Sequence, residues 1–232
     1  MFKKSFLALT LAMCTLGFAG GLEAASPQPL TSKEANIVTV AALTAQGDLI
    51  KLKTALNTAL DDGMTVNEAK EVLVQMYAYC GFPRSLNGIN TLIAVIDERK
   101  AAGITDVMGR DAAPVDPQRD RYASGAKTQT ALVGRPVAGR TYDFAPVIGV
   151  FLKEHLFGDI FERDLLNWQE RELATVGALA GIGNVNAQLT SHMRVSMNTG
   201  ITKAQLQAAV DVLSAKVGSA TGANAQQILN KL

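Results

Sequence analysis

The alternation of apolar and polar positions along this chain occurs twice. Residues 52–81 (LKTALNTALDDGMTVNEAKEVLVQMYAYCG) correspond to residues 189–218 (LTSHMRVSMNTGITKAQLQAAVDVLSAKVG), with Gly63 opposite Gly200 at a separation of 200 − 63 = 137. In each copy an apolar helix ends at this glycine, where a left-handed backbone closes a helix most easily. The next helix places apolar residues three or four positions apart, which indicates one buried face. The pattern predicts a duplicated helical unit.

The signals that start a helix repeat with the same separation. Thr65 and Thr202 each stand two residues after the closing glycine, and Glu68 and Gln205 follow three positions later. This spacing is typical of a capping box, in which the two side chains satisfy free backbone amides at the start of a helix. A second helix is therefore expected to begin at each threonine.

A third matched segment precedes each copy. Residues 30–48 correspond to 166–184 at a separation of 166 − 30 = 136, and Thr31 with Glu34 has the spacing of another capping box. The change from 137 to 136 places a gap of a single residue in a turn between two helices. Each unit is thus expected to contain about three helices.

The segment between the two units, residues 103–145, lacks a sustained helical period. It carries Pro114, Pro117 and Pro136 among glycines and charged residues. A stretch of this length without a period is predicted to be an irregular linker or arm. A helical pattern resumes at Phe151, and no segment reads convincingly as a β-strand. The sequence therefore predicts an all-α fold in which an irregular arm joins two helical units packed as one domain. Apolar faces on units too small to close their own cores also favour a homo-oligomer.

Composition and charge narrow the classes of partner. Of the 232 residues 48% are hydrophobic, and the formal net charge is only +1. A chain of this length buries a sizeable core without disulfide bonds. A nearly neutral chain lacks the basic surface that binds nucleic acid or an anionic membrane, so we expect neither partner.

The first 25 residues have the three parts of a secretory signal. Lys3 and Lys4 precede an apolar stretch over residues 6–19, and small residues follow up to Ala24 and Ala25. A membrane anchor is less favoured, because this stretch is shorter than the roughly 20 residues that cross a bilayer. We expect a cleaved signal over residues 1–25, a periplasmic or secreted protein, and no stable membrane span after cleavage.

Three further motifs identify a family resemblance. They are YCGFPRSLNGI from Tyr79, RELATVGALAGIG from Arg171 and QLTSHMRVSMNTGIT from Gln188. Together they resemble the carboxymuconolactone decarboxylase family, whose superfamily also contains the alkylhydroperoxidase D-like disulfide peroxidases. The resemblance covers about residues 30–98 and 150–218, and it implies duplicated alkylhydroperoxidase D-like units. It also implies a homo-oligomer, a trimer or a hexamer.

The resemblance also implies where a peroxidase site would fall. In that branch a Glu is followed by a Cys-x-x-Cys pair and then by a His four residues after the second Cys. Carried onto the second unit, the Glu falls on Glu172 and the His on His192, whereas the cysteines fall on Val185 and Gln188. Both sulfurs are missing, so the dithiol mechanism is not available. The first unit lacks the whole set. Its equivalent positions lie near Asn36, Asp48, Leu52 and Ala55.

His192 and Glu172 are the main catalytic candidates. An imidazole transfers protons near neutral pH, and a nearby carboxylate sets its tautomer. The alternative for His192 is a partly buried structural side chain among apolar neighbours. The alternative for Glu172 is a solvated acid in the first turn of a helix, where acids favour the helix dipole. Catalysis requires Glu172 to turn inward and meet His192, and Glu170 is the replacement if the register differs by two residues.

Cys80 is the third candidate. Cys14 lies in the expected signal, so Cys80 is the only cysteine after cleavage and the mature monomer has no internal disulfide. Because Cys80 stands near a helix end that Pro83 helps to terminate, the helix dipole raises rather than lowers its pKa, which argues against a strongly activated thiolate. The other histidine of the mature chain, His155, has no recognisable partner and is expected to be structural.

These candidates leave three functions open. The first is cofactor-free acid–base chemistry on a small lactone or organic acid through His192. The second is a one-cysteine peroxidase, with peroxiredoxin-type activity, through Cys80. The third is a non-catalytic, oligomeric binding protein that kept the fold. The sequence shows no metal-ligand spacing and no phosphate-binding loop, so we expect no metal and no cofactor.

Overall fold

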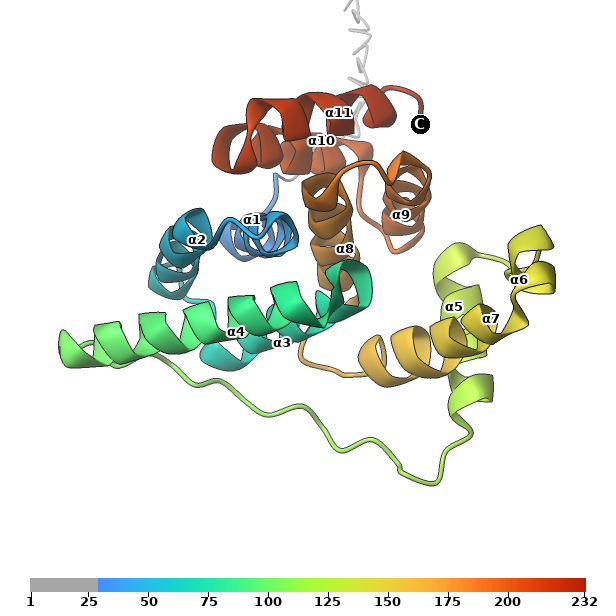
Figure 1. The fold of residues 1–232 in the computed structure, drawn as a ribbon, viewed down its shortest axis with the longest axis horizontal. Helices are drawn as coiled ribbons and strands as arrows, with labels where there is room; N and C mark the ends of the chain where they lie inside the picture. Colours follow the sequence, from blue (N-terminus) through green and yellow to red (C-terminus); the bar gives the residue numbers. More distant parts are fainter. Residues whose placement is uncertain (1–28) are drawn as a thin grey trace, which may run out of the picture.

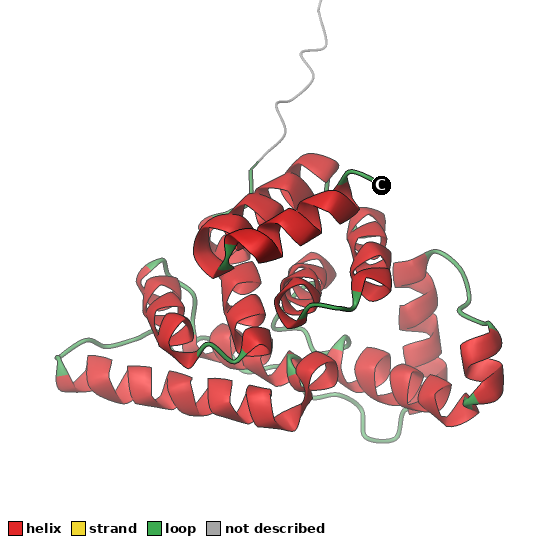
Figure 2. Ribbon diagram, turned by 45° about the horizontal axis from the view of Figure 1, so that its top comes forward, coloured by secondary structure: helices red, strands yellow, loops and turns green. Residues whose placement is uncertain are grey.

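The computed structural model of the chain describes residues 29–232, so the expected signal over residues 1–25 lies outside the described residues. Within 29–232 the structure contains helices, turns and loops but no strand, which confirms the all-α prediction (Figure 2). No helix in this part of the chain is both long and apolar enough to cross a membrane.

Each repeated unit contains four α-helices rather than the three that we expected. The first unit consists of α1 (Ser32–Gln46), α2 (Leu49–Asp61), α3 (Val66–Gln75) and α4 (Tyr77–Ala101). The second consists of α8 (Trp168–Ile182), α9 (Asn186–Asn198), α10 (Lys203–Val212) and α11 (Ser219–Leu229), with a π-helical turn, η2 (Leu213–Val217), before α11. The sequence pattern ended near Gly81 and Gly218. Gly81 has a non-helical backbone (φ 81°, ψ 159°) within α4, so the additional helix of the first unit is the part of α4 after Gly81, and that of the second unit is α11.

The predicted helix starts are confirmed. Thr65 caps α3 and Thr202 caps α10, in each case with a complete capping box. Thr31 caps α1 in the same way through Glu34. Local side-chain chemistry therefore fixes these boundaries, as the sequence pattern indicates.

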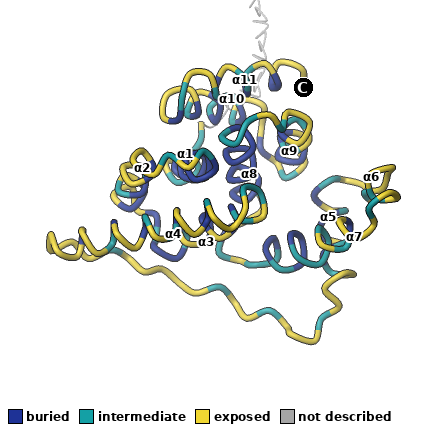
Figure 3. The backbone as a smooth tube through the Cα atoms, in the orientation of Figure 1, coloured by how far each residue is buried: buried dark blue, intermediate teal, exposed yellow. Residues whose placement is uncertain are grey.

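Two equivalent helices, α1 and α8, pack against each other at the centre of the molecule (Figure 3). Gly177 and Gly181 of α8 allow the close approach, because a Cβ atom on Gly181 would lie 2.4 Å from the carbonyl oxygen of Ala42. One continuous apolar cluster includes residues of α1–α4 and of α8–α11. The two units thus share a single core and form one domain.

A buried ion network also joins the two units. Glu71 of α3 accepts hydrogen bonds from Arg171 of α8 at 2.7 Å and from Arg163 at 2.8 Å. Gln75 accepts a further hydrogen bond from Arg171 and donates one to the hydroxyl of Thr175. Arg171 is completely buried, so its charge depends on these partners.

The segment that we predicted to be an irregular arm is only partly irregular. Residues 104–120 contain no helix, but α5 (Arg121–Val133) and the short α6 (Arg140–Phe144) follow. The helical pattern then continues in α7 (Pro146–Phe151) and a π-helical segment, η1 (Leu152–Ile160). Residues 121–133 were predicted to be irregular, and this prediction was wrong. They show no apolar helical period because the face that α5 buries consists mostly of small and polar residues. Its buried positions are Gly125, Thr128, Gln129 and Leu132.

The name arm is used from here on for the segment from α5 to η1, residues 121–160, which lies beside the rest of the fold (Figure 1). A Cβ atom on Gly125 would lie 1.7 Å from the carbonyl oxygen of Lys153, so only glycine permits this contact between α5 and η1. A second apolar cluster combines residues of α5 and η1 with Val195 of α9. The arm therefore packs against α9, on the side of the second unit that carries His192.

Candidate functional site

Glu172 of α8 and His192 of α9 form a direct pair. The Nδ1 atom of His192 lies 2.8 Å from the Oε2 atom of Glu172. Glu172 is completely buried, whereas the side chain of His192 keeps 19% of its surface exposed. Glu170, not Glu172, completes the capping box at the start of α8. The structure therefore assigns the capping role to Glu170 and leaves Glu172 to face His192.

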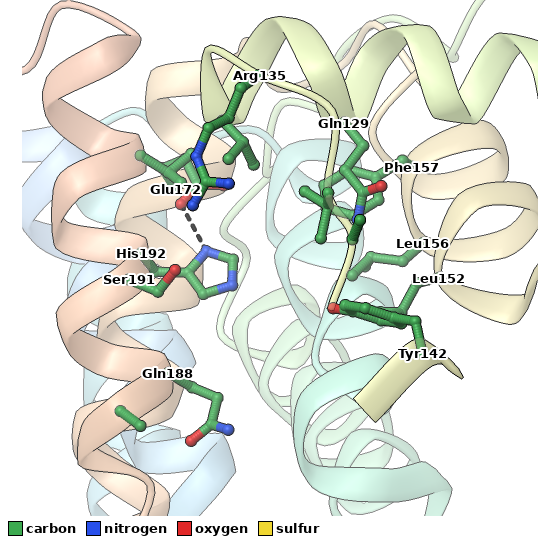
Figure 4. Close-up of a pocket in the computed structure, with 15 residues that line it drawn as sticks. Gln129, Arg135, Tyr142, Leu152, Leu156, Phe157, Glu172, Gln188, Ser191 and His192 are labelled. Atoms are coloured by element: carbon green, nitrogen blue, oxygen red, sulfur yellow. Dashed lines mark hydrogen bonds and ion pairs between the residues drawn. The ribbon is translucent and has the colours of Figure 1, made fainter. Parts of the chain in front are cut away.

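Glu172 and His192 line a cavity of ≈ 440 Å³, which we call the His192 cavity. The inner wall comes from Glu172 and from the α9 face that carries Gln188, Ser191 and His192 (Figure 4). The imidazole points its second ring nitrogen, Nε2, away from Glu172 and into this cavity (Figure 4). A proton on Nε2 is thus placed to reach a bound molecule, while Glu172 holds the other side of the ring.

The opposite wall of the His192 cavity is built by the arm, a contribution that the sequence did not reveal. Gln129 and Val133 come from α5, Tyr142 from α6, and Leu156 and Phe157 from η1. The remaining arm residues of this wall are Arg135, Val137, Ala138 and Leu152. This wall combines an apolar surface with a few polar groups, as is usual for a site that binds a small organic molecule.

Arg135 supplies a positive charge to the cavity. Its side chain extends from the loop after α5 toward Glu172 and His192 (Figure 4). Within residues 29–232, Arg135 takes part in no ion pair and no side-chain hydrogen bond. A guanidinium without a carboxylate partner beside a cavity is well suited to bind an anionic group. Arg194 lies in an adjoining hollow that it shares with Arg135, but it does not line the His192 cavity.

Tyr79 of the first unit contacts His192. Its ring meets the ring of His192 edge-on, with 5.8 Å between the centroids. Burial and then the charge of Glu172 raise the pKa of Tyr79, so its phenol stays neutral and able to donate a hydrogen bond. Within the described chain, the Tyr79 hydroxyl and the Oε1 atom of Glu172 are both buried without a hydrogen-bond partner.

Cys80 lies outside the His192 cavity. In the described chain it is not one of the cavity's lining residues, although its neighbour Tyr79 contacts His192. The thiol donates a hydrogen bond to the carbonyl oxygen of Met76 at 3.1 Å. Burial raises the pKa of Cys80, and the charge of Arg84 offsets this only in part. The structure thus joins two of the three candidates and leaves the third apart.

His155 has a partner that we did not foresee. Its Nδ1 atom lies 2.8 Å from the Oδ2 atom of Asp159, one turn later in η1. Burial alone raises the pKa of Asp159, but hydrogen bonds from His155 and Arg121 outweigh it and hold this pKa below its usual value. Because His155 does not line the His192 cavity in the described structure, it fits a structural role within the arm.

Among the described residues, no group of three or more His, Cys, Asp or Glu side chains is placed to hold a metal ion. The polar side chains that line the His192 cavity include an imidazole, a buried carboxylate and an arginine.

Comparison with known proteins adds to this geometry. The model of the carboxymuconolactone decarboxylase family matches residues 11–93 and 148–231. The chain is also 28% identical to a 4-carboxymuconolactone decarboxylase of Acinetobacter baylyi over 91 residues, which are 38% of this chain and 67% of the relative. The two family matches leave out residues 94–147, which include α5, α6 and Arg135. Much of the outer wall of the His192 cavity thus lies outside the matched segments.

Proposed function

Because this chain belongs to the carboxymuconolactone decarboxylase family, we propose that it is an enzyme that transfers protons through His192 and Glu172. The substrate is a small organic acid or a carboxylated lactone, and no cofactor is required. The observation that carries the proposal is the 2.8 Å contact between Nδ1 of His192 and Oε2 of Glu172 at the wall of the His192 cavity.

The geometry favours His192 as the general acid and base. With Nδ1–H donated to Glu172, the imidazole accepts or donates a proton through Nε2, which faces the cavity (Figure 4). Glu172 orients the ring and stabilises the imidazolium cation that forms when Nε2 gains a proton. Glu172 is buried, and its Oε2 atom contacts the ring, so it acts on the substrate only through His192.

Decarboxylation is the reaction that these groups fit best, and it is the activity named for the relative from Acinetobacter baylyi. The bond between carbon and the carboxylate breaks, carbon dioxide leaves, and the electron pair moves into a conjugated carbonyl group. Arg135 stabilises the negative charge that develops on the carbonyl oxygen. His192 then donates the Nε2 proton to carbon, a new C–H bond forms, and solvent returns a proton to the imidazole.

A one-cysteine peroxidase is less well supported. The thiol that would attack a peroxide must be a thiolate, and burial raises the pKa of Cys80. The Cys80 thiol is also engaged with the carbonyl oxygen of Met76. A non-catalytic binding protein is compatible with the same fold, and the assay described next separates it from an enzyme.

The test is a screen for release of carbon dioxide from small carboxylated lactones and keto acids. We expect turnover by the full chain and a loss of at least about a hundredfold in His192→Ala, since general acid–base catalysis contributes about that much. Glu172→Gln should also lower kcat. The matched control is His155→Ala, which removes the other histidine of the chain without touching the cavity. Turnover that survives in His192→Ala contradicts the proposal, and a screen without any turnover favours the binding protein.

We also propose that the protein is exported. The pattern of Lys3, Lys4 and the apolar stretch that follows supports export to the periplasm or beyond. Mass spectrometry of the protein recovered from the producing cells should find an N-terminus near residue 26.

Self-association is supported by an apolar face on α4. Phe82, Leu86 and Ile93 are each more than half exposed there. Large apolar side chains that gather on one exposed face are typical of a protein interface. We propose a trimer or a hexamer, as the family resemblance implies, and light scattering measures the mass. A monomer at micromolar concentration would contradict this part of the proposal.

A further inference from the structure

A second cavity lies in the first unit, between α1 and α2. Its volume is ≈ 220 Å³, about half that of the His192 cavity. We call it the first-unit cavity. It is lined by residues of α1 and α2 and by Lys216, which belongs to η2 of the second unit. None of the roles considered so far uses it.

The first-unit cavity is the internal copy of the His192 cavity. The separations of 136 and 137 residues between the two units relate Glu172 to Asn36 and His192 to Ala55. The second unit contributes six residues of α8 and α9 to the His192 cavity, and all six have their counterparts in the lining of the first-unit cavity. These counterparts are Asn36, Ile50, Lys51, Thr54, Ala55 and Thr58. The duplication therefore preserved a cavity as well as a fold.

The lining of the first-unit cavity lacks the groups that would transfer protons in the His192 cavity. Ala55 stands in place of the imidazole, and Asn36 stands in place of the carboxylate. The amide of Asn36 is already engaged, since its Nδ2 atom donates to Asp62 at 2.8 Å. A molecule bound here meets no acid–base pair like that of His192 and Glu172.

Two lysines give the first-unit cavity positive charge at other positions of the repeat. Lys51 replaces Gln188, one position before the residue that we had estimated, and Lys216 replaces Tyr79 at a separation of 216 − 79 = 137. Lys51 donates to the carbonyl oxygen of Val217 at 3.0 Å and lies 3.8 Å from Asp48. Within residues 29–232, Lys216 makes no ion pair and no side-chain hydrogen bond, so its ammonium group is available to a ligand.

The remaining lining residues give the cavity a charged end and an apolar end. The hydroxyls of Thr39, Thr54 and Thr58 donate to carbonyl oxygens of their own helices, so they offer a ligand only acceptor oxygens. Leu43 and Ala55 provide apolar surface. Because the free ammonium group is that of Lys216, an anionic group is attracted to that end of the cavity, and an apolar body fits the remainder.

We propose that the first-unit cavity is a second, non-catalytic binding site for a small amphipathic anion, a carboxylate with an apolar body. The carboxylate pairs with Lys216, and the body lies against Leu43 and Ala55. The ligand binds and leaves unchanged, because the groups that would act on it are absent from the cavity lining. This inference does not depend on the reaction at His192.

The test uses benzoate as the probe and the full chain as the protein. In a ¹H–¹⁵N correlation titration, we expect saturable shifts of the amides of Thr39, Thr54 and Ala55. The Lys216→Met variant keeps an aliphatic stem without charge, and we expect it to raise the Kd at these amides about tenfold, as for the loss of one charge-assisted hydrogen bond. Lys203→Met is the matched control, since Lys203 does not line the cavity in the described structure, and should leave the Kd unchanged.

Two further arms separate this site from the His192 cavity. His192→Ala should leave the shifts at Thr39, Thr54 and Ala55 intact, even where it abolishes turnover. Benzamide, which has the same shape without the charge, should bind at least about tenfold more weakly than benzoate. The proposal is overturned if these amides do not respond, if Lys216→Met binds as well as the unaltered chain, or if the shifts occur only around His192.

Discussion

Arg171 and Glu172 are consecutive residues of α8, both completely buried, and they serve different partners. Arg171 donates to Glu71 of the first unit at 2.7 Å, while Glu172 accepts from His192 of the second unit at 2.8 Å. Neighbouring residues of one helix thus belong to a structural ion network and to the candidate catalytic pair. Because α8 packs against α1 of the first unit and against α9 of its own unit, the orientation of Glu172 depends on both contacts.

The first prediction concerns Arg135. In Arg135→Gln we expect KM for an anionic substrate to rise about tenfold, because one charge-assisted hydrogen bond is lost. We also expect kcat to decrease, because the proposed mechanism uses the guanidinium to stabilise the developing negative charge. Steady-state kinetics of the carbon dioxide assay measure both constants.

Arg194→Gln is the matched control for that change. Arg194 lines the adjoining hollow but, in the described chain, not the His192 cavity. Its KM should therefore stay within about twofold of the unaltered protein, a change that is worth less than half of one charge-assisted hydrogen bond. If the two substitutions raise KM equally, Arg135 attracts the substrate only through the general positive charge of the surface and does not bind it directly.

The second prediction concerns Cys80. Because burial raises its pKa, we expect the thiol to react with iodoacetamide more slowly at pH 7 than free cysteine does. Treatment with hydrogen peroxide and dimedone should leave Cys80 without a sulfenic acid adduct, and Cys80→Ser should retain full decarboxylase turnover. Mass spectrometry of the peptide that contains Cys80 reads the adduct, and a stoichiometric adduct would restore the peroxidase hypothesis.

The third prediction concerns the ion network between the units. Glu71→Gln removes the carboxylate that Arg171 and Arg163 share, and it leaves the buried charge of Arg171 without a compensating anion. Loss of one partner of a buried pair lowers the free energy of unfolding by about 3 kcal/mol. Urea denaturation followed by circular dichroism measures the change.

Glu98→Gln is the control for the network. Glu98 pairs with Lys53 at the surface, where both side chains are about half exposed. Surface pairs contribute little, so the free energy of unfolding should change by less than about 1 kcal/mol. If both variants lose the same stability, the buried network has no special role in joining the units.

The fourth prediction concerns acid. Burial alone raises the pKa of Glu71, but the hydrogen bonds from Arg163 and Arg171 outweigh it and hold this pKa below its ordinary value of 4.5. A carboxylate whose pKa is lower in the folded state stabilises the fold fully above the ordinary pKa. This stabilisation is lost as the pH falls from about 4.5 through the folded-state pKa.

Urea denaturation at a series of pH values between 7 and 3 tests this dependence. The unaltered chain should lose stability more steeply below pH 5 than Glu71→Gln does, because the variant has no carboxylate to protonate. Parallel curves for the two proteins would show that other carboxylates control the acid transition.

Local sequence chemistry predicted the helix starts. Thr65 with Glu68 and Thr202 with Gln205 form the expected capping boxes, because such a box involves only residues three positions apart. The same reasoning missed α5, whose buried face contains Gly125, Thr128 and Gln129. Their burial results from the close contact with η1, and an apolar periodicity does not report it.

The candidate site was predictable in part. The family resemblance indicated both Glu172 and His192, and the structure brings them into contact. Cys80 was proposed because no other sulfur remains after signal cleavage and because unpaired thiols are uncommon in exported proteins, and the structure places it outside the lining of the His192 cavity. Arg135 was not found, since it belongs to a segment without a helical period and outside the family matches.

The sequence by itself determined the duplication, the helical class and the capping boxes, because each of these depends on residue types and their spacing along the chain, and the family resemblance added the pair Glu172 and His192. Only the tertiary structure decided that the arm folds onto α9, that Arg135 joins the His192 cavity and that the first unit keeps a cavity with lysines. Those features depend on contacts between residues far apart in the chain. Such contacts are set by how small side chains let helices approach, and a linear pattern does not encode that distance.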